Sequence, residues 1–457
     1  MKKVLLVITN IMGFHETPYS FGLNSIMSAI LHAGHNVDLL VIKTQNDYAL
    51  FSEKLKTFAP DIVGFSAVSS QFGFVKDLST IVKKFNPLIT TVCGGVHPTL
   101  YPDDLLTAEH IDGFFRGESE ISVVAFLNAP NLEATKKINN YCYISENKLI
   151  INPLESLIKN LEVLPYPNKG DGFQEFISTS GFAPFFFSRG CPYNCSYCSN
   201  HALAKTYGMQ TNTPRYRNAM SCIEEIKDAQ KKFAFSKIWF LDDTFGLDKK
   251  WRNEFLSLYS KEINLPFICL LRANIASEEY IKQLKDARCA RIIFGVESGS
   301  ERIRNEIMKR NLSTDVIIKA FDLCRKYKIE TCALNIIGCP DETLEEIQMT
   351  IKLNRKIKPS ASGINIFYPY KGTVLGDQAF SSNLVDEPRY LNFSNERRGT
   401  VLRFSEEHEK KLIKIYQNWD RQVYPYDIKR SIIRVVSKNK FPFSVLKKIR
   451  KKLLKIF

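Results

Sequence analysis

The sequence lacks any long apolar run. The apolar stretch nearest its start, residues 4–8, passes directly into polar residues. Such a stretch is too short for a signal peptide, and no stretch approaches the roughly 18 apolar residues that a membrane-spanning helix needs. We therefore expect a cytoplasmic protein.

Cysteine is absent after Cys339, and only Cys93 and Cys142 precede residue 190. The total of 11 cysteines is odd, and in a reducing compartment such residues are better explained as metal ligands or small buried side chains than as disulfides. Eight of them are scattered through apolar surroundings, where a buried free thiol is the ordinary explanation. The remaining three lie close together.

Acidic residues are absent from residues 438–457, which contain eight Lys or Arg. More than half of the formal net charge of +15 therefore lies in this tail. The rest of the chain is only mildly basic, which argues against nucleic acid as a partner. The tail fits either a helix on an anionic membrane surface or a helix docked on its own protein, because its apolar residues share one helical face: Leu446, Ile449, Leu453 and Ile456.

The chain is long enough for two or three domains, since it has 457 residues of which 44% are hydrophobic. Residues 1–130 alternate short apolar strands with amphipathic helices, which is typical of a doubly wound, flavodoxin-like parallel sheet. We expect its strands at 4–8, 36–41, 62–66, 89–93 and 113–115. Residues 131–183 lose this rhythm and are interpreted as a linker or strap.

A second alternating series occupies residues 184–373. Six strands are expected there, at 185–187, 237–241, 267–272, 291–294, 331–337 and 363–367. Six β/α units in succession favour a partial, TIM-like barrel, in which chemistry gathers at the carboxyl ends of the strands. Residues 374–457 are expected to form a mainly helical extension that ends in the basic tail.

The three clustered cysteines are Cys191, Cys195 and Cys198, in a loop that begins after Gly190. A [4Fe–4S] cluster normally takes four thiolates, so three with no fourth nearby indicate a cluster with one iron left open. A structural zinc site is the alternative, and it would need another ligand such as His201.

This CxxxCxxC loop resembles that of the radical SAM superfamily. The resemblance implies that S-adenosylmethionine chelates the open iron through its amino and carboxyl groups. One electron from the cluster, provided by a donor such as flavodoxin or ferredoxin, then yields methionine and a 5′-deoxyadenosyl radical that abstracts hydrogen.

The same resemblance assigns residues at the ends of several strands to S-adenosylmethionine. Asp242 and Asp243 are expected near its amine, although two acids after a strand can also cap the next segment. Arg272 is expected at its carboxylate or at a substrate anion, with a structural salt bridge as the alternative. Glu297 and Ser298 are expected at the ribose hydroxyls. Gly338 is expected beside adenine, although Leu334 stands where the family has another glycine.

The first domain ends two strands in small residues, at the edge where doubly wound folds bind ligands. Its Gly94-Gly95-Val96-His97-Pro98 turn and Arg116-Gly117-Glu118-Ser119-Glu120 stretch resemble the cobalamin-binding domain that precedes the barrel in one radical SAM subfamily. The resemblance implies a cobalamin site formed by these residues: Ser66, Ser69, Gly94, Gly95 and His97. The loop of residues 10–18 lacks the DxHxxG motif, so His15 is not expected to ligate cobalt. A domain that merely supports the barrel is the alternative.

These resemblances imply an enzyme with one cluster per chain that methylates an unactivated carbon of a small molecule or lipid by a cobalamin-dependent radical reaction. A radical cyclase or oxidase, similar to the anaerobic magnesium-protoporphyrin monomethyl ester cyclases, is the alternative. A non-catalytic iron–sulfur or nucleic-acid-binding factor is the alternative from another class. Methylthiotransferases are excluded because their first domain carries three further cysteines.

Overall fold

The computed structural model describes residues 1–11, 19–211, 213–391, 396–427 and 430. The first third of the chain builds a seven-stranded sheet in the order β2-β1-β3-β4-β5-β6-β7. Its first five strands are parallel, and each lies within two residues of the range that the sequence predicts: β1 Lys3–Thr9, β2 Asn36–Ile42, β3 Ile62–Ser66, β4 Thr90–Gly94 and β5 Gly113–Phe115. The expected doubly wound architecture is confirmed.

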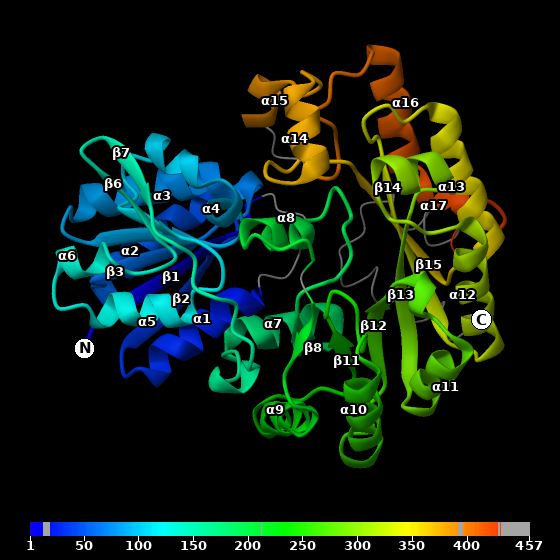
Figure 1. Cartoon of the computed structure of the whole chain (residues 1–457), viewed down its shortest axis with the longest axis horizontal. Helices are drawn as coiled ribbons and strands as arrows, with labels where there is room; N and C mark the ends of the chain where they lie inside the picture. The colour runs from blue at the N-terminus through cyan, green and yellow to red at the C-terminus, as the bar shows by residue number, and fades with distance from the viewer. Residues whose placement is uncertain (12–18, 212, 392–395, 428–429, 431–457) are drawn as a thin grey trace.

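Helices cover both faces of this sheet, because side chains on both faces of its strands are apolar. In β1, Leu5 and Val7 pack towards α2 and α3, while Val4 and Leu6 pack towards α1 and α5. Figure 1 shows these two helical layers in blue and cyan. The helices and helical turns of this part are α1 Phe21–His32, η1 Gln45–Asp47, α2 Tyr48–Phe58, η2 Ser69–Gln71, α3 Phe72–Phe85, α4 Val96–Leu100, η3 Pro102–Thr107, α5 Glu120–Asn128 and α6 Leu132–Thr135.

The sheet continues beyond residue 130, into the segment that the sequence analysis interprets as a strap. Strands β6 Tyr141–Ser145 and β7 Lys148–Ile151 add an antiparallel hairpin to β5, so the sheet is mixed at this edge. The turn between them places Glu146 and Asn147 at φ values of 50° and 59°. Hairpin turns of this kind are usually marked by Asn-Gly or Asp-Gly, and the absence of that signal explains why the hairpin is not evident from the sequence.

The second sheet has six parallel strands in the order β15-β14-β13-β12-β11-β8, which confirms the expected partial barrel. Its strands are β8 Ala183–Phe185, β11 Ile238–Phe240, β12 Phe267–Leu271, β13 Cys289–Glu297, β14 Glu330–Ile337 and β15 Ala361–Ile366. The helices and turns between them are α9 Ala219–Lys232, α10 Lys249–Glu262, η5 Ala273–Ile275, α11 Glu278–Asp286, η6 Arg302–Ile307, α12 Thr314–Lys326 and α13 Leu344–Ile357. Element η6 is a π-helix.

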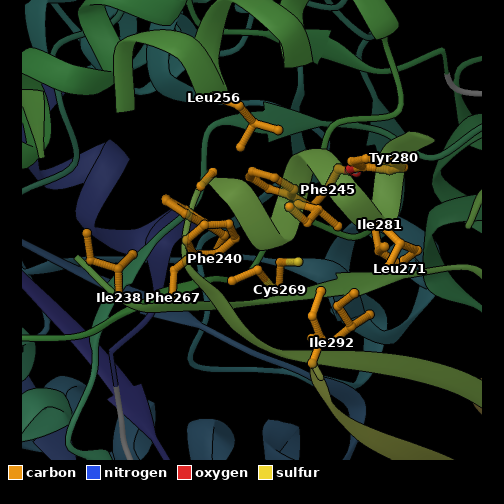
Figure 2. Packing of buried hydrophobic residues seen from close by; sticks show 14 of the residues in the cluster. Ile238, Phe240, Phe245, Leu256, Phe267, Cys269, Leu271, Tyr280, Ile281 and Ile292 are labelled. Atoms are coloured by element: carbon orange, nitrogen blue, oxygen red, sulfur yellow. The ribbon is translucent and has the colours of Figure 1, made fainter. Parts of the chain in front are cut away.

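Aromatic side chains fill the core between the first barrel strands and their helices. Phe240 stacks on Phe245 at 5.0 Å between ring centroids and meets Phe255 and Phe267 edge-on at 5.5 and 5.1 Å. Figure 2 shows this packing around Phe240, Phe245 and Phe267. Such pairs add to the burial of apolar surface, so this end of the barrel is a rigid support for the loops above it.

Three smaller units complete the described chain. Residues 161–180 contain η4 Leu161–Val163 and α7 Asp171–Ser180, and a two-stranded ribbon of β9 Ser188–Arg189 and β10 Arg215–Tyr216 flanks α8 Ser199–Thr206. The extension after the barrel contains α14 Val374–Ser381, α15 Glu387–Leu391, α16 Glu406–Gln417 and α17 Trp419–Val423, and α16 and α17 pack on α13 and β15. The basic tail lies outside the described residues. Among the described helices, none has both the length and the apolar character needed to cross a bilayer.

Candidate functional site

The three clustered cysteines lie in one loop, residues 190–198, between β9 and α8. We call it the cluster loop. Gly190 begins the loop with a φ of +101°, a conformation that favours glycine. Cys198 ends the loop as the N-cap residue of α8, and its N–H donates a hydrogen bond to Cys195 O at 3.1 Å. Burial raises the pKa of Cys198 to about 12, with smaller contributions from the neighbouring Cys195 and Cys191. The cluster loop therefore carries one buried and two partly buried thiols.

Two guanidinium groups lie beside the most buried of these thiols. Arg272, which follows β12, places Nη1 3.5 Å from Cys195 Sγ, and Nη1 of Arg310 lies 3.9 Å from the same atom. Arg272 also stacks 4.0 Å above the ring of Tyr193 in the cluster loop. Both arginines are more than nine-tenths buried, and the Nε of each has no hydrogen-bond partner among the described residues.

Glu297 lies on the other side of Arg310. It ends β13 with a φ of 65° next to a register shift in the sheet, and its carboxylate lies 3.3 Å from Nη1 of Arg310. Burial raises the pKa of Glu297, and the charge of Arg310 opposes that rise. The structure thus brings Glu297 and Arg272 together around the cluster loop.

The two neighbouring acids after β11 point to different places. Oδ1 of Asp242 accepts hydrogen bonds from the backbone of Phe187 and Ser188, at 3.0 and 2.7 Å, and from the Ser188 hydroxyl at 2.5 Å. Burial raises the pKa of Asp242 to about 6. Asp243 instead lines a cavity next to Asn200. Asp242 therefore holds the strand that leads into the cluster loop, and Asp243 is available to a ligand.

Ser298 and Gly338 have packing roles in the structure. Ser298 is fully buried, and its hydroxyl lies 3.4 Å from the hydroxyl of Thr350 in α13. Gly338 has a φ of +75°, and a Cβ there would lie 2.8 Å from Leu412 of α16. Their assignment to S-adenosylmethionine stays a prediction.

A cavity of about 520 Å³ lies between the first domain and the barrel. The carboxyl ends of β3 and β4 supply Ser66, Gly94 and Gly95 to its wall, and the barrel side supplies Gly190 and Asp243. Its inner part is apolar, lined by residues of β1, α1 and α5. The cavity therefore joins the predicted cobalamin-binding edge to the cluster loop.

The shape of this wall depends on Gly95. Its φ is +102°, and a Cβ would lie 2.8 Å from Ala67 O. Ser69 and His97 are not among the described residues that line the cavity. Nδ1 of His97 instead lies 3.2 Å from the Ser69 hydroxyl, and Nε2 lies 3.2 Å from Asp104. His15 lies outside the described residues.

The donor set fits an iron–sulfur cluster, because three cysteines share one loop beside two cationic side chains whose Nε atoms are unpaired within the described structure. His201, the candidate zinc ligand, places Nδ1 3.2 Å from Asn194 Oδ1. In the described ranges, no three His, Cys, Asp or Glu side chains are placed to hold a single metal ion. The cavity fits a corrinoid in position and in its glycine-lined, largely apolar wall.

Two residues at the site, Arg310 and Arg189, are not predicted from the sequence. Arg310 follows η6 and reaches the cluster loop across 115 residues of sequence. Arg189 precedes Gly190 directly, and its partners lie in the first domain. The position of Arg189 beside the cysteine motif is a sequence signal for its contact, whereas no local signal indicates that of Arg310.

Comparisons with known proteins agree with this geometry. The profile of the Radical SAM superfamily matches residues 185–353, and that of the B12 binding domain matches residues 11–127. The uncharacterized methyltransferase PH0819 of Pyrococcus horikoshii is 31% identical over 344 residues, which cover 72% of each chain. The anaerobic magnesium-protoporphyrin IX monomethyl ester cyclase of Rubrivivax gelatinosus is 25% identical over 360 residues, which cover 75% of this chain and 63% of the cyclase.

Two solved structures share the fold. The radical S-adenosylmethionine methyltransferase TsrM from Kitasatospora setae, bound to tryptophan and a SAM analogue, superposes with a TM-score of 0.69 at 17% identity, covering 84% of this chain and 76% of TsrM. The cobalamin-dependent S-adenosylmethionine radical enzyme OxsB, with aqua-cobalamin and S-adenosylmethionine, gives 0.65 at 16% identity, covering 93% and 62%.

Proposed function

This chain belongs to the radical SAM superfamily, in the group whose barrel follows a B12-binding domain, and from that membership we propose that it is a cobalamin-dependent radical SAM methyltransferase. Its substrate is a small molecule or lipid with an unactivated carbon. Residues 1–130 hold cobalamin, and residues 184–373 hold the cluster and S-adenosylmethionine.

The observation that carries the proposal is the single cavity that reaches from Gly94 and Gly95 to Gly190 and Asp243. A corrinoid against Gly94 and Gly95 and a nucleoside at Gly190 and Asp243 would share one cavity. When bound, the cluster supplies the electron that splits S-adenosylmethionine into methionine and a 5′-deoxyadenosyl radical, and cobalamin supplies the methyl group.

The chain's own residues position these groups. Cys191, Cys195 and Cys198 hold the cluster, and Arg272 and Arg310 balance the negative charge of the thiolates. Asp243 accepts hydrogen bonds from the cofactor's amine, and Asp242 fixes the strand before the loop. A flavodoxin or ferredoxin delivers the electron. Contact of the basic tail with a membrane is a further prediction.

The test is transfer of a labelled methyl group to the protein's corrinoid. Protein reconstituted with iron, sulfide and hydroxocobalamin is freed of unbound corrinoid, reduced, and given S-adenosylmethionine with a deuterated methyl group. The proposal predicts about one cobalt per chain and a corrinoid that carries the label by mass spectrometry. A bound corrinoid that never takes the label favours the cyclase-type alternative. A chain that retains no cobalt contradicts the assignment of the first domain.

A further inference from the structure

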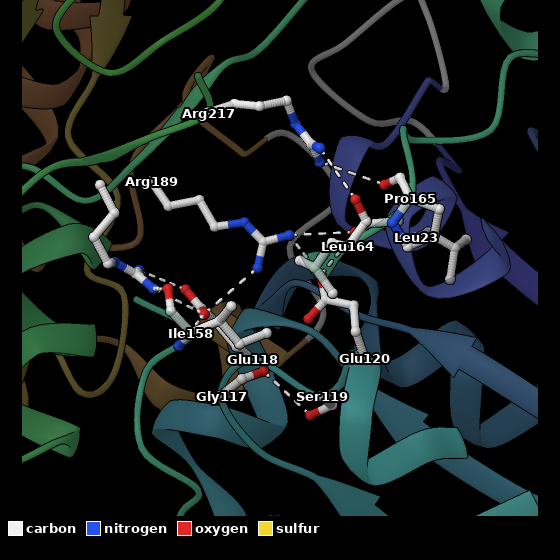
Figure 3. A network of polar contacts seen from close by, with 12 residues as sticks. Leu23, Gly117, Glu118, Ser119, Glu120, Ile158, Leu164, Pro165, Arg189 and Arg217 are labelled. Atoms are coloured by element: carbon white, nitrogen blue, oxygen red, sulfur yellow. Dashed lines mark hydrogen bonds and ion pairs between the residues drawn. The ribbon is translucent and has the colours of Figure 1, made fainter. Parts of the chain in front are cut away.

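A four-residue segment of the first domain, residues 117–120, contacts the barrel at the entrance of the cluster loop. Arg189, two residues before Cys191, extends its guanidinium into the first domain. Its Nη2 lies 2.5 Å from Oε1 of Glu120, and its Nη1 lies 3.5 Å from Oε2 of Glu118. Figure 3 shows Arg189 between these two carboxylates. The strand that leads into the cluster loop is thereby tied to the other domain.

The second strand of the ribbon reaches the same segment. Arg215 lies opposite Arg189 in the β9–β10 register. Its guanidinium donates two hydrogen bonds to the Glu118 carboxylate, at 2.6 and 3.0 Å. A bidentate pair of this kind fixes orientation as well as distance. Glu118 and Arg215 are 17% and 13% exposed, so solvent screens this pair little. Arginines from both strands of the ribbon therefore bind the same short segment, residues 117–120.

The exit of the cluster loop reaches this segment too. Helix α8 begins at Ser199, directly after Cys198, and ends at Thr206. The next residue, Tyr207, accepts the N–H of Glu118 on its hydroxyl oxygen at 2.8 Å. Gly117 has a φ of +68°, and a Cβ there would lie 2.0 Å from that oxygen. Only a glycine permits this approach. The cluster loop is thus held at both ends by residues 117–120.

The same segment forms part of the cavity wall. Gly117, Glu118 and Glu120 line the cavity together with Arg189 and Gly190. Burial alone would raise the pKa of Glu120, but the charge of Arg189 and the hydrogen bonds from Arg189 and Ser25 leave that pKa below its ordinary value. A group bound in the cavity would therefore contact a charged segment, residues 117–120, whose hydrogen bonds and ion pairs reach both sides of the cluster loop.

We infer that residues 117–120, with Arg189 and Tyr207, couple the two cofactor sites, so that a corrinoid in the cavity changes the affinity of the cluster for S-adenosylmethionine. Arg189 and Tyr207 are positioning residues, because they act through the cluster loop. The inference rests on the cofactors of the proposed function. Linkage requires the effect to be reciprocal, so S-adenosylmethionine changes the affinity for the corrinoid by the same factor.

The experiment titrates an analogue of S-adenosylmethionine, in which nitrogen replaces the sulfonium sulfur so that the cluster does not cleave it, into protein with a reduced cluster, with and without bound corrinoid, and follows the change in the electron paramagnetic resonance of the cluster. The coupling factor is the ratio of the two dissociation constants. We expect at least about a fivefold ratio in the unaltered chain. It should fall to within about twofold of one in the Arg189→Gln/Glu120→Gln double variant, which removes both charges so that neither is left buried alone. Tyr207→Phe tests the other end of the loop and should also lower the ratio.

The matched control is Lys43→Gln. It removes an ion pair between Lys43 of the first domain and Glu175 of α7, which also joins the two parts of the chain but is half-exposed and makes no contact with the cluster loop that the described structure records. Its ratio should equal that of the unaltered chain. Iron content and the spectrum of the cluster without S-adenosylmethionine are measured for every variant.

The outcomes separate this inference from the proposed function. Failure to retain hydroxocobalamin overturns both. Retention with a ratio near one in the unaltered chain overturns the coupling alone. A ratio that survives in both the double variant and Tyr207→Phe also overturns it. Loss of cluster from the variants, with an unchanged ratio in the fraction that remains loaded, shows a purely structural role and overturns it as well.

Discussion

Arg310 donates a hydrogen bond of 2.6 Å from its Nη1 to the hydroxyl of Tyr197. Tyr197 lies in the cluster loop, and Arg310 also donates to Gly295 O at 2.6 Å and lies 3.3 Å from the Glu297 carboxylate. Burial raises the pKa of Tyr197 well above its usual value, and that of Arg310 rises because Tyr197 and Glu297 together outweigh the cost of burial. A single cation therefore joins the cluster loop to the end of β13.

Replacing this cation should destabilise the protein through Glu297. Arg310→Met leaves the Glu297 carboxylate buried without its counter-charge, which costs about 3–5 kcal/mol when a buried pair loses one partner. The double variant Arg310→Met/Glu297→Gln removes the stranded charge and should recover a large part of that loss. Chemical denaturation of the cluster-free protein measures both. Equal stability of the single and double variants would contradict this view of the pair.

Substitutions of the two adjacent acids after β11, Asp242 and Asp243, should have different effects on the cluster and on S-adenosylmethionine binding. Asp243→Ala should keep the cluster and weaken S-adenosylmethionine binding by at least about tenfold, because a hydrogen bond to a charged group is worth about 1.5–3 kcal/mol. Asp242→Ala leaves three donors on Phe187 and Ser188 without their acceptor, so it should lower the iron content and the thermal stability. The opposite pattern, with iron lost only from the Asp243 variant, would reverse the two roles.

Gly95→Ala tests the cavity wall. The added Cβ would lie 2.8 Å from Ala67 O, and the alanine would have to keep a φ of +102°, which favours glycine. The backbone of the wall therefore has to shift. We expect the variant to retain less than about half of the cobalt that the unaltered chain keeps after gel filtration, because retention depends on the shape of this wall. Gly73→Ala is the control, since a Cβ there meets nothing within 4 Å. Full cobalt retention by Gly95→Ala would remove Gly95 from the site.

The buried carboxyl group of Glu342, in the loop between β14 and α13, should make the stability of the protein depend on pH. Burial raises the pKa of Glu342 to about 8 from 4.5, although its Oε2 accepts N–H groups of Gly338 and Cys339 and Arg302 lies near. The folded chain holds this proton more tightly than the unfolded chain does, so stability falls as pH rises from 4.5 to about 8. The melting temperature of cluster-free protein should therefore drop between about pH 6 and pH 9.

The matched variant isolates that contribution. Glu342→Gln cannot titrate, so its melting temperature should drop less over the same interval than that of the unaltered chain. Glu346 serves as a reference, because its hydrogen bond from Arg302 and those from Thr343 and Ser300 hold its pKa at about 2, below this interval. An equal drop in the unaltered chain and in Glu342→Gln would assign the pH dependence to other groups.

The strands could be predicted because each is a short apolar run whose faces are both covered. The β6–β7 hairpin could not, since its turn residues Glu146 and Asn147 carry no strong turn signal and its pairing with β5 is a long-range event. Local spacing identified the cluster cysteines, because three thiolates on one loop need no distant partner. It could not show that Asp242 and Asp243 face different ways, nor that Arg310 would reach Cys195 from a distant part of the chain.

The cobalamin-like turn shows a related limit. A motif marks residues that a fold needs, and it does not say which of them touch a ligand. Gly94 and Gly95 line the cavity, whereas the Ser69 hydroxyl lies 3.2 Å from Nδ1 of His97, and Nε2 of His97 lies 3.2 Å from Asp104. Which of these residues reach the cavity depends on the path of the backbone after β4, where Gly95 brings the chain close to the backbone of Ala67.

Production of 5′-deoxyadenosine is the measurement that tests the central claim most directly. Protein prepared without oxygen and reconstituted with iron and sulfide is mixed with S-adenosylmethionine and dithionite, and the products are separated by chromatography. We expect 5′-deoxyadenosine and methionine in equal amounts from the unaltered chain and from Cys142→Ala, which removes a buried thiol outside the cluster loop, and none from Cys195→Ala. A cluster-loaded, unaltered chain that releases no 5′-deoxyadenosine would contradict the assignment of this protein as a radical enzyme.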